Sequence, residues 1–339
     1  MQKGIKMKKV AINGFGRIGR LALRQLLGST EYKVVAINSR GTPEDAAYLF
    51  KYDTVHRTYD EALVDHSDEG IIIDGELIYS FNFDSPSECP WRELDIDVVL
   101  ECSGIFTTRE KAEMHIKAGA KKVIISAPSK SEDVKTIVYG VNENILNGDE
   151  TVISAASCTT NCLAPVVKVI HEALEIKEGF MTTIHAYTND QATLDGSHSK
   201  GIKSRRGRAA AENIVPTSTG AAEGIGNVIP ELKGKLSGMA LRVPVPNGSC
   251  IDLTLLVSKE TSSDEINAIL MKNSNDVLKF TTDPVVSSDV IGTTSGALVD
   301  GSLTKVDGES NRLVKIVAWY DNEYGYTAQM LKTMEESFK

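Results

Sequence analysis

Short apolar runs alternate with amphipathic stretches through the first half of the chain. Four runs are apolar over nearly their whole length, which is typical of parallel strands buried on both faces. They cover Lys8–Asn13, Lys33–Asn38, Asp97–Cys102 and Lys122–Ser126. Helical spacing follows the first run over Arg17–Leu27 and precedes the fourth over Thr108–Ala118. This alternation predicts an α/β domain with a Rossmann-type, doubly wound parallel sheet.

The pattern changes near residue 152. A helix is expected over Leu163–Leu174, and longer strand-like runs then follow one another with few helices between them. These runs cover Gly179–Tyr187, Met239–Pro244, Ser249–Ser258 and Arg312–Trp319. They predict a second, α+β domain whose sheet is mostly antiparallel. The last segment, Asn322–Lys339, is expected to form a helix that returns to the first domain.

A glycine-rich loop joins the first predicted strand to the first predicted helix. Gly14, Gly16 and Gly19 have the spacing G-x-G-x-x-G. In this spacing the glycines permit a tight turn, a close approach of backbone to a pyrophosphate, and close helix–strand packing. The helix start offers N–H groups and partial positive charge to the anion. The expected cofactor-binding residues here and at the neighbouring strand ends are Gly14, Gly16, Arg17, Ile18, Gly19, Asn38, Ser39, Arg40 and Ser126.

The end of the second predicted strand lacks the acidic residue that would hold an adenosine ribose 2′-hydroxyl. Ser39 and Arg40 stand there instead. A hydroxyl and a guanidinium can receive a 2′-phosphate, which a carboxylate would repel. This position favours NADP, with NAD still possible. The alternative is that Arg40 is only a solvated loop residue and the ribose is held loosely.

Composition narrows the class of protein. The chain has 339 residues, enough for about two domains, and a formal charge of −9, which argues against nucleic-acid binding. It shows neither an apolar run long enough for a membrane span nor a signal-peptide core. Five cysteines, sparse and odd in number, suit reduced thiols in the cytoplasm and do not have metal-site spacing.

Cys158 begins the helix that opens the second domain, within Ser157-Cys158-Thr159-Thr160-Asn161-Cys162. A cysteine in the first turn of a helix has its thiol pKa lowered by the helix N-terminus, which favours a nucleophilic thiolate. Cys162 lies one turn later, where a small buried side chain is the better interpretation. Such a nucleophile needs a base. His185, on the strand expected from Gly179, is the leading candidate. We therefore predict a dinucleotide-binding domain of residues 1–157 and 322–339, and a catalytic domain of residues 158–321.

Four motifs together resemble the phosphorylating glyceraldehyde-3-phosphate dehydrogenase family, in order along essentially the whole chain. They are the segments Ala11–Arg20, Ser157–Cys162, Thr182–Gln191 and Trp319–Tyr326. The resemblance implies that Cys158 attacks the aldehyde while His185 takes its proton. A thioester then forms, and inorganic phosphate cleaves it to 1,3-bisphosphoglycerate. It also implies a homotetramer that acts on a small phosphorylated aldehyde, while the charge and the apolar runs described above argue against a nucleic-acid or membrane partner.

The same resemblance implies two anion sites and a nicotinamide site. Thr188, Asp190 and Arg242 would line the site for the substrate C3 phosphate. The attacking phosphate would be bound by Ser157, Thr159, Arg206, Thr219 and Gly220. Asn322 would hold the nicotinamide carboxamide, and Tyr326 would pack against the ring.

Departures from the family pattern bear on the coenzyme. NAD-linked members usually have Asp where this chain has Ser39, and Leu-Pro where it has Gly196-Ser197. Both changes are similar to those of NADP-using members. The change at Ser39 removes a negative charge, and the change at Gly196-Ser197 makes room and adds the Ser197 hydroxyl beside a 2′-phosphate. The loop 199–207 is longer than usual, which leaves open whether Arg206 or Arg205 is the phosphate ligand. Ala155 replaces a usual Asn, with no evident consequence.

Two alternative functions remain open. An erythrose-4-phosphate dehydrogenase would share Cys158 and His185, although His185–Asp190 is more similar to the glyceraldehyde-phosphate enzymes. A catalytically idle relative that serves in binding or adhesion would be expected to have lost the nucleophile, the base or the anion-binding residues. This chain keeps them all.

Overall fold

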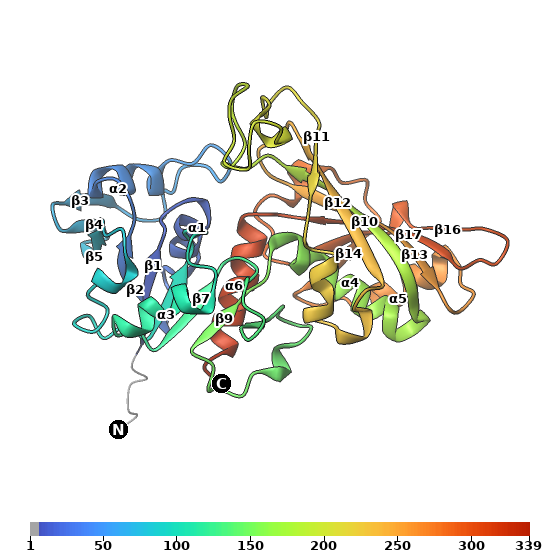
Figure 1. Cartoon of the computed structure of the whole chain (residues 1–339), viewed down its shortest axis with the longest axis horizontal. Coiled ribbons are helices and arrows are strands. Elements are labelled where there is room, and N and C mark those ends of the chain that lie inside the picture. Colours follow the sequence, from blue (N-terminus) through green and yellow to red (C-terminus); the bar gives the residue numbers. More distant parts are fainter. Residues whose placement is uncertain (1–6) are drawn as a thin grey trace. The chain divides into compact units, whose positions relative to one another are not determined.

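The computed structural model describes residues 7–339, which form two compact units (Figure 1). The first unit contains the described residues up to Ile137, together with Asn144–Ala156 and Met330–Lys339. The second contains Val138–Glu143 and Ser157–Gln329. Each unit has a sheet of its own.

The first unit contains a nine-stranded sheet of order β3-β4-β5-β2-β1-β6-β7-β9-β8. Its strands are β1 (Lys8–Asn13), β2 (Tyr32–Asn38), β3 (Val64–Ser67), β4 (Gly70–Ile73), β5 (Glu76–Phe81), β6 (Val98–Glu101), β7 (Lys122–Ile125), β8 (Lys135–Thr136) and β9 (Val152–Ser154). The strands from β5 to β8 in this order are parallel, which confirms the predicted doubly wound sheet. The antiparallel β3–β4–β5 edge is an addition that the apolar pattern did not indicate.

Helices cover both faces of this sheet. Val10 and Ile12 of β1 pack in one core with residues of α1 (Arg17–Leu26) and α2 (Pro43–Lys51). Ala11, between them, packs in a second core with α3 (Arg109–Lys117). Because successive side chains of a strand point to opposite faces, a strand buried on both sides must be apolar throughout.

The second unit contains an eight-stranded sheet of order β11-β12-β10-β13-β17-β15-β14, with β16 beside β17. Its strands are β10 (Ile176–Ala186), β11 (Val215–Ser218), β12 (Leu236–Val243), β13 (Ser249–Val257), β14 (Leu278–Thr281), β15 (Ala297–Asp300), β16 (Lys305–Asp307) and β17 (Leu313–Tyr320). Its helices are α4 (Cys158–Leu174) and α5 (Ser263–Lys272). Five of the seven strand pairs are antiparallel, as predicted; β10–β12 and β14–β15 are parallel. Figure 1 shows β12, β10, β13 and β17 running side by side.

The last helix, α6 (Tyr324–Glu336), follows β17. Its first residues belong to the second unit, and the chain from Met330 belongs to the first. Met330, Leu331 and Met334 pack in the same core as β1 and α1. Among residues 7–339, no helix combines the length and the apolar character that crossing a membrane requires.

The glycine-rich turn after β1 has two glycines that the fold itself requires. Gly14 has φ +93°, and a Cβ there would lie 2.5 Å from the backbone nitrogen of Ser103. A Cβ on Gly19 would lie 2.2 Å from the Gly14 carbonyl oxygen. Gly16, by contrast, has no atom within 4 Å of its Cβ position. The absence of a side chain at Gly16 therefore has no explanation in the packing of the protein, and it fits a group that approaches from outside.

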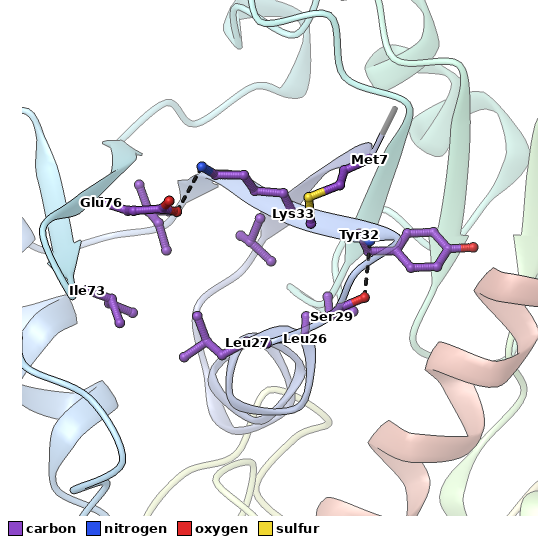
Figure 2. A pocket seen from close by; sticks show the side chains of 11 residues that line it. Met7, Leu26, Leu27, Ser29, Tyr32, Lys33, Ile73 and Glu76 are labelled. Carbon is purple, nitrogen blue, oxygen red and sulfur yellow. Dashed lines mark hydrogen bonds and ion pairs between the residues drawn. The ribbon is translucent and has the colours of Figure 1, made fainter. Parts of the chain in front are cut away.

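A cavity of about 250 Å³ lies near the amino ends of strands in this sheet (Figure 2). Leu26, Leu27 and Ile73 line it, and the ion pair between Lys33 Nζ and Glu76 Oε2, 2.8 Å apart, lies at its side. Lys33 and Glu76 lie at the amino ends of β2 and β5, whereas the glycine-rich turn follows the carboxyl end of β1. The cavity is therefore distinct from the expected dinucleotide site.

The glycines predict opposite effects of one substitution. Gly14→Ala should lower the free energy of unfolding by about 2 kcal/mol or more, because positive φ and a backbone clash both oppose a side chain. Gly16→Ala, at an extended residue that faces open space, should change it by less than about 0.5 kcal/mol and instead weaken dinucleotide binding. Urea unfolding and coenzyme titration of both variants test this. Equal stability losses would contradict it.

Candidate active site

Helix α4 places Cys158 at its first position. Ser157 caps the helix, its Oγ accepting the Thr160 N–H at 3.1 Å. The preceding residue, Ala156, has φ +58°, a conformation that costs a residue with a side chain about 1–2 kcal/mol. The chain thus turns sharply out of β9 so that the thiol emerges at the helix start.

His185 Nε2 lies 3.4 Å from Cys158 Sγ. The histidine is the penultimate residue of β10 and is 4% exposed, while the cysteine keeps partial exposure. The predicted nucleophile and base therefore meet, although 27 residues separate them in the chain. This distance is within the reach of a sulfur hydrogen bond.

The other imidazole nitrogen determines which tautomer His185 adopts. His185 Nδ1 lies 2.7 Å from the carbonyl oxygen of Ala186, which can only accept a hydrogen bond. Nδ1 therefore carries the proton. Arg242 Nη1, 3.0 Å from Nδ1, donates to the Ala186 oxygen at 2.9 Å and to Thr188 Oγ1 at 3.0 Å. His185 Nε2 is left with its lone pair towards Cys158, as a base requires.

The expected lowering of the Cys158 thiol pKa is wrong for the free protein. Burial raises that pKa, against the opposing charge of Arg242 and hydrogen bonds from Thr159. Burial, followed by the charge of Arg242, lowers the pKa of His185 to about 3. The pair therefore rests as neutral thiol and neutral imidazole. A helix N-terminus is a local feature, and tertiary desolvation outweighs it here.

Strand pairing brings a cationic cluster to this pair. Arg242 on β12 is the register partner of His185 on β10. Thr188 donates its hydroxyl to Asp190, and Asp190 forms an ion pair with Arg206 Nη1. Arg206 lies in a short helical turn, Arg205–Gly207, and its Nε donates to Thr217 Oγ1 at 3.1 Å. Arg205 is exposed, so the structure favours Arg206 as the ligand between the two arginines.

Arg242 also carries an unused donor. Its Nε is buried and has no hydrogen-bond partner in the described part of the chain. A buried guanidinium with an unpaired N–H is unfavourable unless a ligand completes it. Arg242 and Arg206 therefore present cationic groups to an anionic ligand beside Thr188, and the carboxylate of Asp190 holds Arg206 in place.

Hydroxyl groups on the other side of Cys158 are partly engaged by the protein. Ser157 is occupied in capping α4, and Thr159 Oγ1 lies 2.9 Å from Tyr320 Oη and 4.0 Å from Cys158 Sγ. Thr219 Oγ1 accepts the Ala221 N–H at 3.3 Å. Gly220 is exposed, and its carbonyl oxygen accepts the Gly224 N–H at 2.9 Å. Ser157 and Thr159 adjoin the thiol in the first turn of α4.

Tyr320 is a site residue that was not predicted from the sequence. Its hydroxyl is buried between Thr159 Oγ1 and Thr183 Oγ1, the latter at 2.8 Å, and its ring meets that of His185 edge to face. Burial raises its pKa well above the usual value for a phenol. It lies inside the recognised segment Trp319–Tyr326, so the signal was present, but only tertiary packing shows the contact. Cys162 is buried against the β17 backbone, as expected.

The other second-unit candidates occupy different environments. Asn322 and Tyr326 are both buried, just beyond β17 and in the first turns of α6. Ser197 is exposed at the edge of a hollow that Asp190, Gln191 and Lys200 also line.

In the first unit, the predicted cofactor residues gather at the carboxyl edge of the parallel strands. Gly16 begins α1 without a side-chain cap. Ser39 and Ser126, just beyond β2 and β7, are partly exposed, as is Ile18 in the first turn of α1. Arg40 is exposed, with Nη2 3.9 Å from Asp84 Oδ1.

Two of these residues have side chains engaged elsewhere. Asn38 donates to Asn13 Oδ1 at 2.8 Å and exchanges hydrogen bonds with the Phe83 backbone. The Arg17 guanidinium pairs with Asp53. Burial raises the pKa of Asp53, but hydrogen bonds from Arg17 and from backbone N–H groups lower it more, to about 2. The side chains of Asn38 and Arg17 are thus both engaged within the protein.

A buried carboxylate supports the glycine-rich turn, and sequence reasoning did not single it out. Glu101, at the end of β6, accepts Asn13 Nδ2 at 2.5 Å, the Ser103 N–H at 2.8 Å and the Ser103 hydroxyl. His115 Nε2 lies 3.0 Å from the same carboxylate, and Trp91 Nε1 donates to His115 Nδ1 at 2.9 Å. The network holds Asn13 and Ser103, the residues against which Gly14 turns.

Comparison with known proteins agrees with this geometry. Residues 8–109 match the family model described as glyceraldehyde 3-phosphate dehydrogenase, NAD binding domain, and residues 157–322 match its C-terminal domain. A glyceraldehyde-3-phosphate dehydrogenase of Clostridium pasteurianum is 53% identical over 330 residues, which cover 97% of this chain and 98% of the relative. That of Clostridium acetobutylicum is 52% identical over 97% of this chain and 98% of its own length, and that of Streptococcus pyogenes serotype M1 is 50% identical over 96% and 97%. With both domains matched and such identity over nearly the whole length, the chain belongs to the glyceraldehyde-3-phosphate dehydrogenase family of nicotinamide-dependent oxidoreductases that act on an aldehyde.

Proposed function

We propose that this protein is a phosphorylating glyceraldehyde-3-phosphate dehydrogenase that prefers NADP(H). It would oxidise glyceraldehyde 3-phosphate with inorganic phosphate to 1,3-bisphosphoglycerate, reversibly. The observation that carries the proposal is the Cys158–His185 pair at 3.4 Å beside a cationic cluster that has an unsatisfied donor. Dehydrogenases that use no anionic substrate have no need of such a cluster.

The first step adds the thiol across the aldehyde. Cys158 Sγ bonds to the carbonyl carbon as its proton passes to His185 Nε2, and His185 returns this proton to the carbonyl oxygen, which gives a neutral thiohemiacetal and a neutral imidazole. A resting thiolate is not needed, because proton removal accompanies attack. The lone pair on Nε2, held in place by the Nδ1 bond to Ala186, makes this transfer direct.

Oxidation and phosphorolysis complete the cycle. The thiohemiacetal carbon loses hydride while His185 takes the hydroxyl proton, which leaves a thioester on Cys158. A phosphate oxygen then attacks the thioester carbon, the carbon–sulfur bond breaks, and the sulfur regains a proton from His185. The product is an acyl phosphate. We assign the C3 phosphate to the site that Thr188, Asp190 and Arg242 line, where the Asp190 carboxylate orients Arg206, and the attacking phosphate to the site that Ser157, Thr159, Arg206, Thr219 and Gly220 line.

The chain offers matching groups for the coenzyme, which supplies the hydride acceptor when bound. The open space at Gly16 and the uncapped start of α1 suit a pyrophosphate. We assign the nicotinamide end to Asn322 and Tyr326, and the adenosine end to Ser39, Arg40 and Ser197.

Arg242 also links substrate binding to basicity. Its charge, after burial, lowers the pKa of His185. An anionic phosphate bound at Arg242 would neutralise that charge and raise the pKa of His185 towards the range of a useful base. His185 would therefore become a stronger base when a phosphorylated aldehyde arrives, and an aldehyde without phosphate would not produce this effect.

The NADP preference rests on charge at the end of β2. Neither Ser39 nor Arg40 would repel a 2′-phosphate, and Arg40 could pair with it. Asp84 competes for Arg40, but exposed ion pairs contribute at most about 1 kcal/mol, so a phosphate dianion can replace it.

Assembly and location complete the proposal. Phe180, Met239, Leu256 and Leu313 are exposed on the same face of β10, β12, β13 and β17, since strand register aligns them. An apolar face of this kind suits an interface between copies of the chain, consistent with a homotetramer. All five cysteines are free thiols, which suits the cytoplasm.

Turnover of aldehydes tests the reaction. Glyceraldehyde 3-phosphate should be oxidised with a higher kcat/KM than erythrose 4-phosphate, and omission of inorganic phosphate should slow it strongly, because phosphate releases the thioester. Cys158→Ala should lose at least about 10³-fold in kcat, since it removes the nucleophile. Cys162→Ala, one turn along α4, is the matched control and should keep activity. Preference for erythrose 4-phosphate without a phosphate requirement would overturn the proposal.

The pH dependence of Cys158 alkylation tests the role of Arg242. Arg242 lowers the pKa of the Cys158 thiol, so Arg242→Gln should raise it and shift the iodoacetamide reaction profile to higher pH. At a fixed neutral pH the variant should therefore react more slowly. Arg205→Gln, which alters an exposed neighbour of Arg206, should leave the profile unchanged. Coincident profiles for Arg242→Gln and the unsubstituted protein would refute the coupling.

Steady-state kinetics with both coenzymes tests the preference. kcat/KM should be higher with NADP(H) than with NAD(H). Ser39→Asp should lower the NADP(H) value by about 10- to 100-fold, because it places a carboxylate beside the 2′-phosphate, and leave the NAD(H) value equal or higher. Arg40→Ala should lower the NADP(H) value alone. A clear NAD(H) preference in the unsubstituted protein would reject this assignment.

A further inference from the structure

Ser249 connects two groups of the active site that the mechanism treats separately. It is the first residue of β13, is 1% exposed, and its Oγ accepts the Ala186 N–H at 3.1 Å. The same Oγ lies 2.6 Å from Asn322 Oδ1. Ala186 is also the residue whose carbonyl oxygen holds His185 Nδ1. Ala186 thus contacts His185 through its carbonyl oxygen, and its N–H group is linked to Asn322 through the Ser249 hydroxyl.

The donor and acceptor groups available determine the direction of both hydrogen bonds of Ser249. The Ala186 N–H can only donate, so it occupies an acceptor position of the Ser249 hydroxyl. A buried hydroxyl must also donate its own proton, and Asn322 is its other partner in the described residues. The atom that Asn322 turns towards Ser249 is therefore its oxygen. Its Nδ2 then points the opposite way and has no partner among residues 7–339.

Sheet register explains why the contact exists. Ser249 is the register partner of Tyr320 at the end of β17, and Asn322 follows two residues later. Asp321, between them, is 1% exposed and accepts hydrogen bonds from Asn247 Nδ2 and from the N–H groups of Gly292, Glu323 and Tyr324. The backbone on both sides of Asn322 is thus anchored, so the remaining freedom is rotation of its amide.

We propose that Ser249 is a positioning residue that locks the Asn322 amide with its NH₂ group presented to the carbonyl oxygen of the coenzyme carboxamide. This inference rests on the proposed placement of the nicotinamide at Asn322. Without the Ser249 hydroxyl the amide can flip and present its oxygen, which would face the carboxamide oxygen without a hydrogen bond. Ser249 therefore contributes to coenzyme use without touching the coenzyme.

Coenzyme kinetics of the full chain tests the proposal. Ser249→Ala should lower kcat/KM for the preferred coenzyme about 10-fold, and leave the KM values of the aldehyde and of inorganic phosphate within twofold. Ser249→Thr, which keeps a hydroxyl, should recover most of the loss. Ser258→Ala, just beyond the other end of β13, is the matched control and should not change coenzyme use. If Ser249→Ala fails to fold, as judged by circular dichroism, Ser249→Cys, whose thiol is a weak donor, replaces it.

A double variant separates positioning from a general structural role. If Ser249 acts through Asn322, the variant Ser249→Ala/Asn322→Ala should be no worse than Asn322→Ala alone. Multiplied losses would show that Ser249 acts by another route and would overturn the proposal. So would a normal Ser249→Ala beside an impaired Asn322→Ala, and this result would leave the proposed function intact. A normal Asn322→Ala would overturn both the nicotinamide placement and the role of Ser249.

Discussion

The hydrogen bond between His185 Nδ1 and the Ala186 carbonyl oxygen, 2.7 Å long and inside the protein, determines what the second unit can do. It leaves Nε2 as the lone-pair nitrogen that faces Cys158. The same carbonyl accepts Arg242 Nη1, so the base and the cation are oriented by one atom. Because backbone carbonyls are held by strand pairing, this orientation is as rigid as the sheet.

This hydrogen bond depends in turn on the register of the strands in the second sheet. Pairing of β10 with β12 places His185 beside Arg242, and pairing of β13 with β17 places Ser249 beside Tyr320. A slip of one residue would turn each of these side chains to the opposite face of the sheet. The buried face of β10, where Met181, Thr183 and His185 alternate with more exposed residues, makes such a slip costly. Packing of the core thus protects the geometry of the site.

Local patterns predicted much of the fold, and tertiary contacts account for what they missed. The runs over β1, β2 and β7 and the glycine spacing were readable because each signal lies within a few residues. Cys158 and His185 could be paired from motifs. The resting protonation of Cys158 could not, since desolvation depends on neighbours from other strands. Glu101, Tyr320 and Ser249 were missed for the same reason: nothing in their own segments shows that they contact Asn13, Thr159 or Asn322.

Buried polar groups that support the fold differ from those of the active site in how completely their hydrogen bonds are satisfied. Glu101 receives donors from Asn13, Ser103 and His115, and such satisfaction by the fold makes a buried polar group rigid and unreactive. Beside Cys158 and His185 one donor is left open, because Arg242 Nε has no hydrogen-bond partner within residues 7–339. Incomplete satisfaction costs stability, and a fold keeps it where a ligand supplies the missing partner. Arg242 Nε is one of several buried side-chain atoms without a hydrogen-bond partner in residues 7–339, and its position beside His185 is what makes it a candidate for ligand binding.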